Sequence, residues 1–188
     1  DIKTALRALL ASDAFYAAQN RGTLVKSPVD LVIGTMRQFD VGYSDPLPLT
    51  FLLRTLGQDL FSPPNVRGWP GGEAWINSTT LLARRQFLER LFRVDEARMQ
   101  TGMSDGMAKG LDRIGNPGEG RARFMRAALD IRFSGGEWLR QFEGAQSPAN
   151  ARLQQVLLAI PPAASAAAEG QGIELVRRLT ADPAYQLK

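Results

Sequence analysis

Apolar residues in this chain recur at intervals of three and four, the spacing that places side chains on one face of an α-helix. Two segments that begin near prolines show this most clearly. Their apolar positions are Val29, Val32, Ile33 and Met36 in the first, and Leu49, Leu52, Leu53, Leu56 and Leu60 in the second. We find no segment with the strict alternation of a half-buried strand. The sequence therefore predicts an all-α fold, an irregular multi-helix bundle.

Capping residues mark where several of these helices begin. Ser27 is placed to act as an N-cap, Pro28 occupies the first helical position and Asp30 lies in the first turn, where a carboxylate favours the helix dipole. Asn77 or Ser78 is expected to cap a helix that ends near Arg93. Further helices are predicted over residues 2–11, 120–133, 134–144, 147–160 and 173–181.

The chain has 188 residues, which is enough for one ordinary domain with a sizeable core. We expect an N-terminal helical portion over 1–93 that contains a long loop at 62–77. A glycine-rich, flexible connection follows over 94–119, and a C-terminal helical portion over 120–188 packs on the first.

Cysteine and histidine are both absent. Disulfides, thiolate nucleophiles and Cys-based zinc sites are thereby excluded, together with the usual general base. Any chemistry would have to use carboxylates, hydroxyls, Lys, Arg or Tyr, or residues supplied by another segment. We therefore expect no catalytic residue, no metal and no cofactor in this chain, and the sequence leans against an enzyme.

The net charge of +4 is spread along the chain rather than gathered in a basic stripe, so nucleic acid is not an expected partner. The apolar runs are far shorter than the roughly 20 residues that a membrane span needs. An export signal, if the protein has one, is expected outside this chain.

The loop "SPPNVRGWPGGEAWIN", residues 62–77, is the leading candidate for a ligand site. Trp69 and Trp75 offer flat rings that could stack on a sugar, and polar contacts could come from Asn65, Arg67, Glu73 and Asn77. The alternative is that both tryptophans pack down as a small satellite core beside the turn. The sequence favours packing but leaves ligand binding open.

Arg84 projects from the middle of an apolar arc on the helix that follows the loop. The arc contains Leu81, Phe87, Leu88, Leu91 and Phe92. A buried guanidinium needs an acceptor, so we expect Arg84 to be structural, locking the preceding corner through loop carbonyls or a carboxylate. Asp59 and Glu73 are the nearest acids and Asp30 a more distant one; the alternative partner is an anionic ligand. Asp59 and Glu73 could also be drawn as an acid/base pair, but their spacing gives that little support.

An internal similarity links the two ends of the chain. "RALLASDAFY" near the start aligns with "RRLTADPAYQ" near the end, with Leu9 on Leu179 and Phe15 on Tyr185. The similarity indicates either two helices that end in the same turn chemistry or a true duplication, and the first is favoured.

Three stretches resemble the C-terminal part of a bacterial family known as domain of unknown function 1800. They are "VKSPVDLVIGTMRQFD", "LGQDLFSPPNVRGWPGGEAWINSTTLLAR" and "VRRLTADPAYQLK". The resemblance covers about half of the chain and leaves out most of the region between Val94 and Gly170. It implies an exported bacterial protein, periplasmic or extracellular, of which this chain is a C-terminal part. It also implies that a sulfatase-like exported protein is encoded nearby in the genome. The family has no known catalytic residue that could be assigned to a position in this sequence.

Two functions are consistent with these observations. The first is a non-catalytic helical scaffold or interaction module, whose partner is the sulfatase-like protein or another polypeptide. The alternative is part of a hydrolase or binding protein that acts on cell-envelope or extracellular polysaccharide through the Trp69/Trp75 loop. The absence of strong bases and nucleophile constellations favours the first.

Overall fold

The computed structural model describes residues 1–101, 131–142, 149–165 and 169–188, and the side chains of all of these except 94–101. Within these ranges the predicted all-α fold is confirmed, and the β-type pairings are two isolated bridges. The elements, in chain order, are α1 (Ile2–Leu10), α2 (Asp13–Tyr16), η1 (Ala18–Asn20), α3 (Pro28–Gln38), α4 (Leu47–Thr55), η2 (Gly72–Trp75), α5 (Ser78–Thr101), α7 (Gly135–Arg140), α8 (Ala149–Leu157), α9 (Gly172–Ala181) and η5 (Pro183–Gln186).

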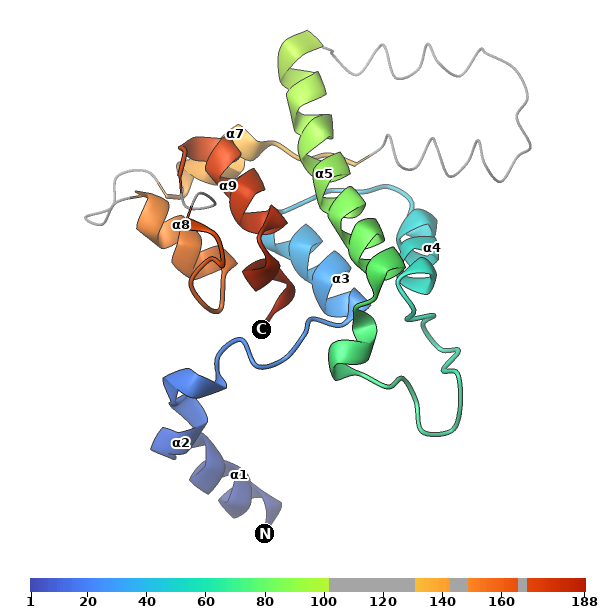
Figure 1. Cartoon of the computed structure of the whole chain (residues 1–188), viewed down its shortest axis with the longest axis vertical. Helices are drawn as coiled ribbons and strands as arrows, with labels where there is room; N and C mark the ends of the chain where they lie inside the picture. Colours follow the sequence, from blue (N-terminus) through green and yellow to red (C-terminus); the bar gives the residue numbers. More distant parts are fainter. Residues whose placement is uncertain (102–130, 143–148, 166–168) are drawn as a thin grey trace.

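Helices α3, α4 and α5 share one hydrophobic core with α7, α8 and α9, which come from the C-terminal part of the chain. Figure 1 shows α3, α5 and α9 in the middle of the molecule, with α4 on one side and α7 and α8 on the other. Helix α9 contacts α5, α7, α8 and η5, and α3 contacts α4. The residues exposed by 1% or less in this core are Leu31, Val32, Phe39, Leu53, Leu56, Leu153, Leu175, Val176, Leu179 and Tyr185.

The predicted start of α3 is confirmed in detail. Ser27 Oγ accepts a hydrogen bond from the Asp30 backbone N–H at 3.1 Å, and Asp30 Oδ2 accepts one from the Ser27 N–H at 3.0 Å. Pro28 occupies the first helical position, where its missing N–H leaves no bond unmade. The reciprocal pair is a capping box, which fixes where the first core helix begins.

Helix α5 is longer than predicted. It continues to Thr101, so the first eight residues of the expected connection at 94–119 are helical. The segment "VDEARMQT" contains good helix formers and no glycine or proline before Gly102, so nothing in it ends the helix. Residues 102–119 lie outside the described residues.

The prediction of a helix over 120–133 is wrong for residues 131–133. Residues 120–130 lie outside the described residues. Ile131–Phe133 is not helical, and Arg132 forms an antiparallel bridge with Gly42. Ser134 caps α7 by accepting from the Glu137 N–H, so the residues before it must lead into a new helix. The cap predicted at Ser147 and Pro148 also lies outside the described residues.

The segment before α3 is held against the C-terminal end of the chain. Val25 and Leu187 form an antiparallel bridge, and the Lys26 N–H donates to the Gln186 carbonyl at 2.7 Å. Gly22 has a φ of +68°, and a Cβ placed on it would lie 2.5 Å from Ile160 Cγ2. Only glycine meets both demands, so this position fixes the path by which the chain leaves η1.

Helices α1 and α2 extend away from the body of the molecule (Figure 1). In the described structure neither helix contains a buried residue. Their exposed apolar side chains are Ile2 (80%), Leu6 (51%), Leu9 (53%), Leu10 (49%), Phe15 (45%) and Tyr16 (66%).

Candidate functional site

The loop between α4 and α5 turns through left-handed backbone conformations. Gly71 and Gly72 have φ values of +71° and +57°, which glycine adopts without strain, and they lead directly into η2. Phe61 adopts a φ of +65° without being glycine, and its ring is 99% exposed. The loop therefore presents Phe61 to solvent at its entrance and turns inward at its end.

Asn65 shapes the tip of the loop. Its side-chain oxygen accepts from the Arg67 N–H at 2.8 Å, and its carbonyl accepts from the Gly68 N–H at 3.0 Å. This is the Asx-type turn expected of an asparagine in a tight bend. The side chains of Asn65 and Arg67 are exposed, as are those of Glu73 and Asn77.

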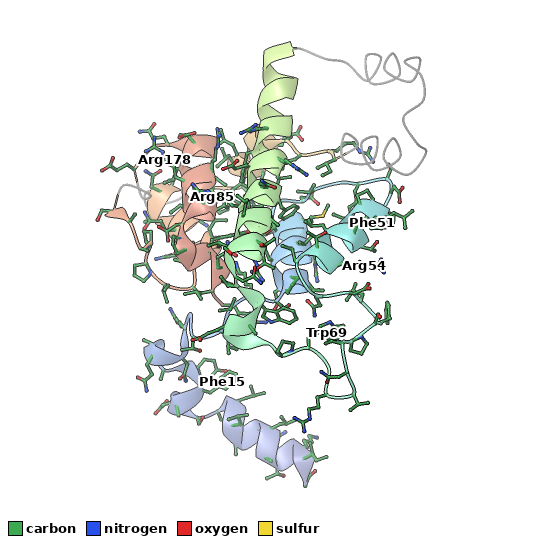
Figure 2. The ribbon with its side chains drawn as sticks, turned by 45° about the vertical axis from the view of Figure 1, so that its right-hand side comes forward. Phe15, Phe51, Arg54, Trp69, Arg85 and Arg178 are labelled. Atoms are coloured by element: carbon green, nitrogen blue, oxygen red, sulfur yellow. The ribbon has the colours of Figure 1, made fainter. Side chains whose placement is uncertain are left out.

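The two loop tryptophans differ in exposure. Trp75 is 7% exposed and lies outside the main core cluster, as expected of a satellite core, whereas Trp69 is half-buried. Figure 2 shows Trp69 on the loop below α4. A buried ring offers no free face for stacking, so only Trp69 is accessible to a flat ligand in this structure. Ligand binding by residues 62–77 stays a prediction.

Asn77 and Thr80 close the loop onto α5. Asn77 Oδ1 accepts from the Thr80 N–H and Thr80 Oγ1 accepts from the Asn77 N–H, both at 2.9 Å. Thr80 Oγ1 also donates to the carbonyl of Trp75 at 3.0 Å. These bonds satisfy free N–H groups at the helix start and hold Trp75 against it.

Arg84 is fully buried, although it carries a charge. Nη2 donates to the Lys26 carbonyl at 2.9 Å and Nη1 donates to Gln186 Oε1 at 3.1 Å. Nε has no hydrogen-bond partner among the described residues. Burial lowers the pKa of Arg84. Its two bonds fasten α5 to the segment before α3 and to the C-terminal end of the chain.

The acids predicted as partners of Arg84 are wrong; Arg84 does bond a loop carbonyl, but it is that of Lys26 and not one in the loop at 62–77. Asp59 pairs with Arg54 at 2.8 Å on the exposed face of α4, and Asp30 is occupied by Ser27 and Lys188. Glu73 is exposed in η2. Arg84 lies almost two turns inside α5, so its side chain reaches the segment before α3 and the C-terminal end of the chain rather than the loop corner. Of its predicted arc, Leu81 is also wrongly placed, being 44% exposed; the other members are buried.

The carboxylate that organises the C-terminal end was not singled out from the sequence. Asp182 is 4% exposed and accepts three backbone hydrogen bonds, from Ala163 at 3.0 Å, Ala164 at 3.2 Å and Ala184 at 2.8 Å. The signal for the cap was present, because Asp182 and Pro183 follow α9 directly. The bonds to residues 163 and 164 depend on tertiary packing and leave no local pattern.

Replacing Asp182 by Ala is expected to lower the free energy of unfolding by about 2–3 kcal/mol, because three backbone N–H groups, of which that of Ala184 is buried, lose a buried charged acceptor. Asp182→Asn retains one acceptor oxygen and should lose less. Urea unfolding monitored by circular dichroism measures both changes. Asp59→Ala, on an exposed ion pair, is the control, and an equal loss in Asp182→Ala and Asp59→Ala would contradict this role.

A second polar cluster surrounds Tyr185 in a groove of about 610 Å³ between α3, residues 155–159 and the chain end. The Tyr185 hydroxyl lies 2.9 Å from Thr35 Oγ1 and donates to Gln38 Oε1 at 3.1 Å. Burial raises the pKa of Tyr185 to about 12, although the bond with Thr35 opposes this. Sequence reasoning missed this cluster because its residues come from distant segments.

The described residues contain no group of three acidic side chains placed to hold a metal ion. Within the same residues no helix is long and apolar enough to cross a membrane.

The fold and the candidate site together define an all-α, multi-helix protein. Its Pro/Gly/Trp loop is hydrogen-bonded to the start of helix α5. The chain belongs to the DUF1800 family: the family model described as "Protein of unknown function (DUF1800)" matches residues 1–187. The match therefore includes the region between Val94 and Gly170, which lies outside the three stretches that resemble the family. No curated protein and no solved structure matches the chain.

Proposed function

We propose that this chain is a non-catalytic helical interaction module of an exported bacterial protein, and that it binds another polypeptide through α1 and α2. The observation that carries the proposal is the apolar face of these helices. Leu6, Leu9 and Phe15 are each about half exposed, and the body of the molecule does not cover them. Several large apolar side chains exposed on neighbouring helices are typical of an interaction site.

The C-terminal end of the chain supports a helical surface as the partner. Leu9, Ala14 and Phe15 align with Leu179, Ala184 and Tyr185, which are 0%, 2% and 1% exposed. The C-terminal copy of the pattern buries its apolar face against α5, α7 and α8. The same residue pattern in α1 and α2 is therefore suited to pack into a groove between helices, as α9 and η5 do.

The polar side of α1 is compatible with this arrangement. Asp1 Oδ1 accepts a hydrogen bond from the Lys3 N–H at 3.1 Å, on the side of the helix away from the apolar residues. Lys3 and Arg7 are exposed on α1, beside the apolar stripe that contains Leu6 and Leu9. The partner that the family resemblance suggests is the sulfatase-like exported protein encoded nearby.

The proposal is tested with the triple variant Leu6→Ser, Leu9→Ser, Phe15→Ser. We expect the affinity for the purified sulfatase-like protein to fall by about 100-fold, because apolar anchors carry most of the energy of an interface. The melting temperature should stay close to that of the unchanged chain, because the three side chains are not part of the core. Surface plasmon resonance and differential scanning fluorimetry provide the two measurements.

The matched control is Lys3→Ser, Thr4→Ala, Arg7→Ser, which alters the same helix outside the apolar stripe. Its affinity should change less than tenfold. Unchanged binding of the Leu6/Leu9/Phe15 variant, or no binding by the unchanged chain, would overturn the proposal. Binding of a polysaccharide that is lost in Trp69→Ala would instead support the alternative function of the loop.

A further inference from the structure

The groove around Tyr185 collects positive charge from three different segments. Lys26 precedes α3, Arg37 lies in its last turn, and Lys188 follows η5; all three line the groove. Asp30 is the one acidic side chain among the lining residues. The side chains that line the groove therefore include three cations and one carboxylate.

Asp30 and Lys188 neutralise each other. Lys188 Nζ lies 2.5 Å from Asp30 Oδ2, and the same oxygen accepts from the N–H and the hydroxyl of Ser27. Burial raises the pKa of Asp30, but the hydrogen bonds from Lys188 and Ser27 outweigh it and hold this pKa below its usual range. Lys188 is thus paired with Asp30. The side-chain charges of Lys26 and Arg37 are not neutralised by this pair.

Lys26 is held in the groove without a carboxylate bonded to it. Its Nζ lies 3.8 Å from the centre of the Tyr185 ring, which is a cation–π contact. The described residues offer this ammonium no hydrogen-bond acceptor. The ring is itself fixed by Thr35 and Gln38, so the position of the ammonium is set by buried groups.

The surroundings of Lys26 make its positive charge costly. Burial lowers its pKa from 10.5 to about 8; Arg84 and Lys188 act in the same direction, and Asp30 acts against them. An anion beside Nζ would offset this loss of solvation and favour the charged form. Arg37, exposed on the same side of α3, could supply a second contact.

We propose that the groove lined by Lys26 and Arg37 binds a small molecule through an oxyanion group, a carboxylate or a sulfate, which the two cationic side chains hold. Val156 is 49% exposed along the same groove and would contact the apolar part of an organic acid. The site is separate from α1 and α2 and from loop 62–77, so it does not depend on the proposed interaction surface.

Two probes distinguish the sources of the oxyanion. Sulfate tests the bare anion and hexanoate tests a carboxylate with an apolar chain, and both keep a constant charge between pH 7 and 9. Isothermal titration calorimetry at constant ionic strength gives the affinities. Tighter binding of hexanoate would identify an organic acid as the ligand class, and tighter binding of sulfate an inorganic or ester sulfate; binding of neither probe overturns the proposal.

Lys26→Met keeps the length of the side chain and the backbone carbonyl that accepts from Arg84. We expect its affinity for the bound probe to fall at least tenfold, and Arg37→Met to lose less. Lys3→Met, on exposed helix α1, is the matched control and should bind normally. Equal affinities of Lys26→Met and the unchanged chain would overturn the proposal. A folded far-ultraviolet spectrum and a cooperative thermal transition establish that Lys26→Met is intact.

The pH dependence provides a second, independent test. The charged form of Lys26 binds the anion, so affinity should fall by about tenfold between pH 7 and 9, as expected for a pKa of about 8. A lysine with the ordinary pKa of 10.5 would show almost no change over this range. Lys26→Arg retains its charge and should bind equally at pH 7 and 9. An unchanged affinity of the unaltered chain at pH 9 would contradict the assignment to Lys26.

Discussion

Arg84→Met is expected to lower the free energy of unfolding by about 2–4 kcal/mol. The substitution leaves the Lys26 carbonyl and Gln186 Oε1 without the donor that they share, at a fully buried position. It also removes a charge whose burial is itself unfavourable. The loss should therefore be smaller than the roughly 3–5 kcal/mol that follows when one partner of a buried ion pair is removed.

The corresponding fall in melting temperature is about 5–15 °C for a chain of this size. Differential scanning calorimetry measures it, with Arg85→Met as the control on the same helix. Arg85 is exposed and 3.6 Å from Glu89, so its replacement should change stability by less than about 0.5 kcal/mol. An unchanged melting temperature for Arg84→Met would show that Arg84 does not hold the structure together.

A double-mutant cycle separates the bond to Gln186 from the rest of the effect. Gln186→Leu removes the acceptor of Arg84 Nη1 and leaves the bond to the Lys26 carbonyl. We expect a coupling energy of about 1–2 kcal/mol between Arg84→Met and Gln186→Leu. Strict additivity of the two changes would contradict the hydrogen bond between these side chains.

The burial of Arg84 could be predicted from the sequence, but its partners could not. The helical angle of position 84 places it among apolar residues, and this depends only on local geometry. Gln186 and Lys26 lie 102 and 58 residues away, and they are brought together by the pairing of the segment before α3 with the chain end. The nearby acids Asp59 and Glu73 were plausible only because they are close in sequence.

The same distinction between local and tertiary effects explains the similar ends of the chain. The apolar periodicity of residues 2–11 and 173–181 predicts a helix in both places, and helices form there as α1 and α9. Leu179 is buried because α9 packs against α5, α7 and α8, whereas Leu9 is half exposed on α1, which contains no buried residue in the described structure. Periodicity indicates that a helix has an apolar face; it does not indicate what covers that face.

The candidate loop shows the same limit. Composition indicates a turn rich in glycine, proline and tryptophan, and the caps at Asn77 and Ser27 follow from residue type and position. Whether a tryptophan in that turn is buried depends on the elements around it. Trp75 lies next to the start of α5 and is covered, whereas Trp69, six residues earlier, is not fully covered.

Phe39→Ala is expected to have the largest effect on stability, a loss of about 3–5 kcal/mol. Phe39 is 1% exposed at the end of α3. Its ring centre lies 5.6 Å from that of Phe92, 5.8 Å from that of Phe133 and 4.8 Å from that of Trp138. The side chain therefore joins α3 to α5, to the segment before α7 and to α7 itself, and its removal leaves a cavity where these elements meet.

Urea unfolding of Phe39→Ala, Phe39→Leu and Phe51→Ala tests this prediction. Phe39→Leu fills most of the cavity and should lose less than half as much stability as Phe39→Ala. Phe51 is 53% exposed on α4 (Figure 2), so its replacement is the control for loss of an aromatic ring at the surface. Losses that are equal in Phe39→Ala and Phe51→Ala would contradict the central position of Phe39. A loss confined to Phe39→Ala would show that core stability depends on the packing of α3 against α5 and α7. The residues next to Phe39 in the sequence do not predict this packing.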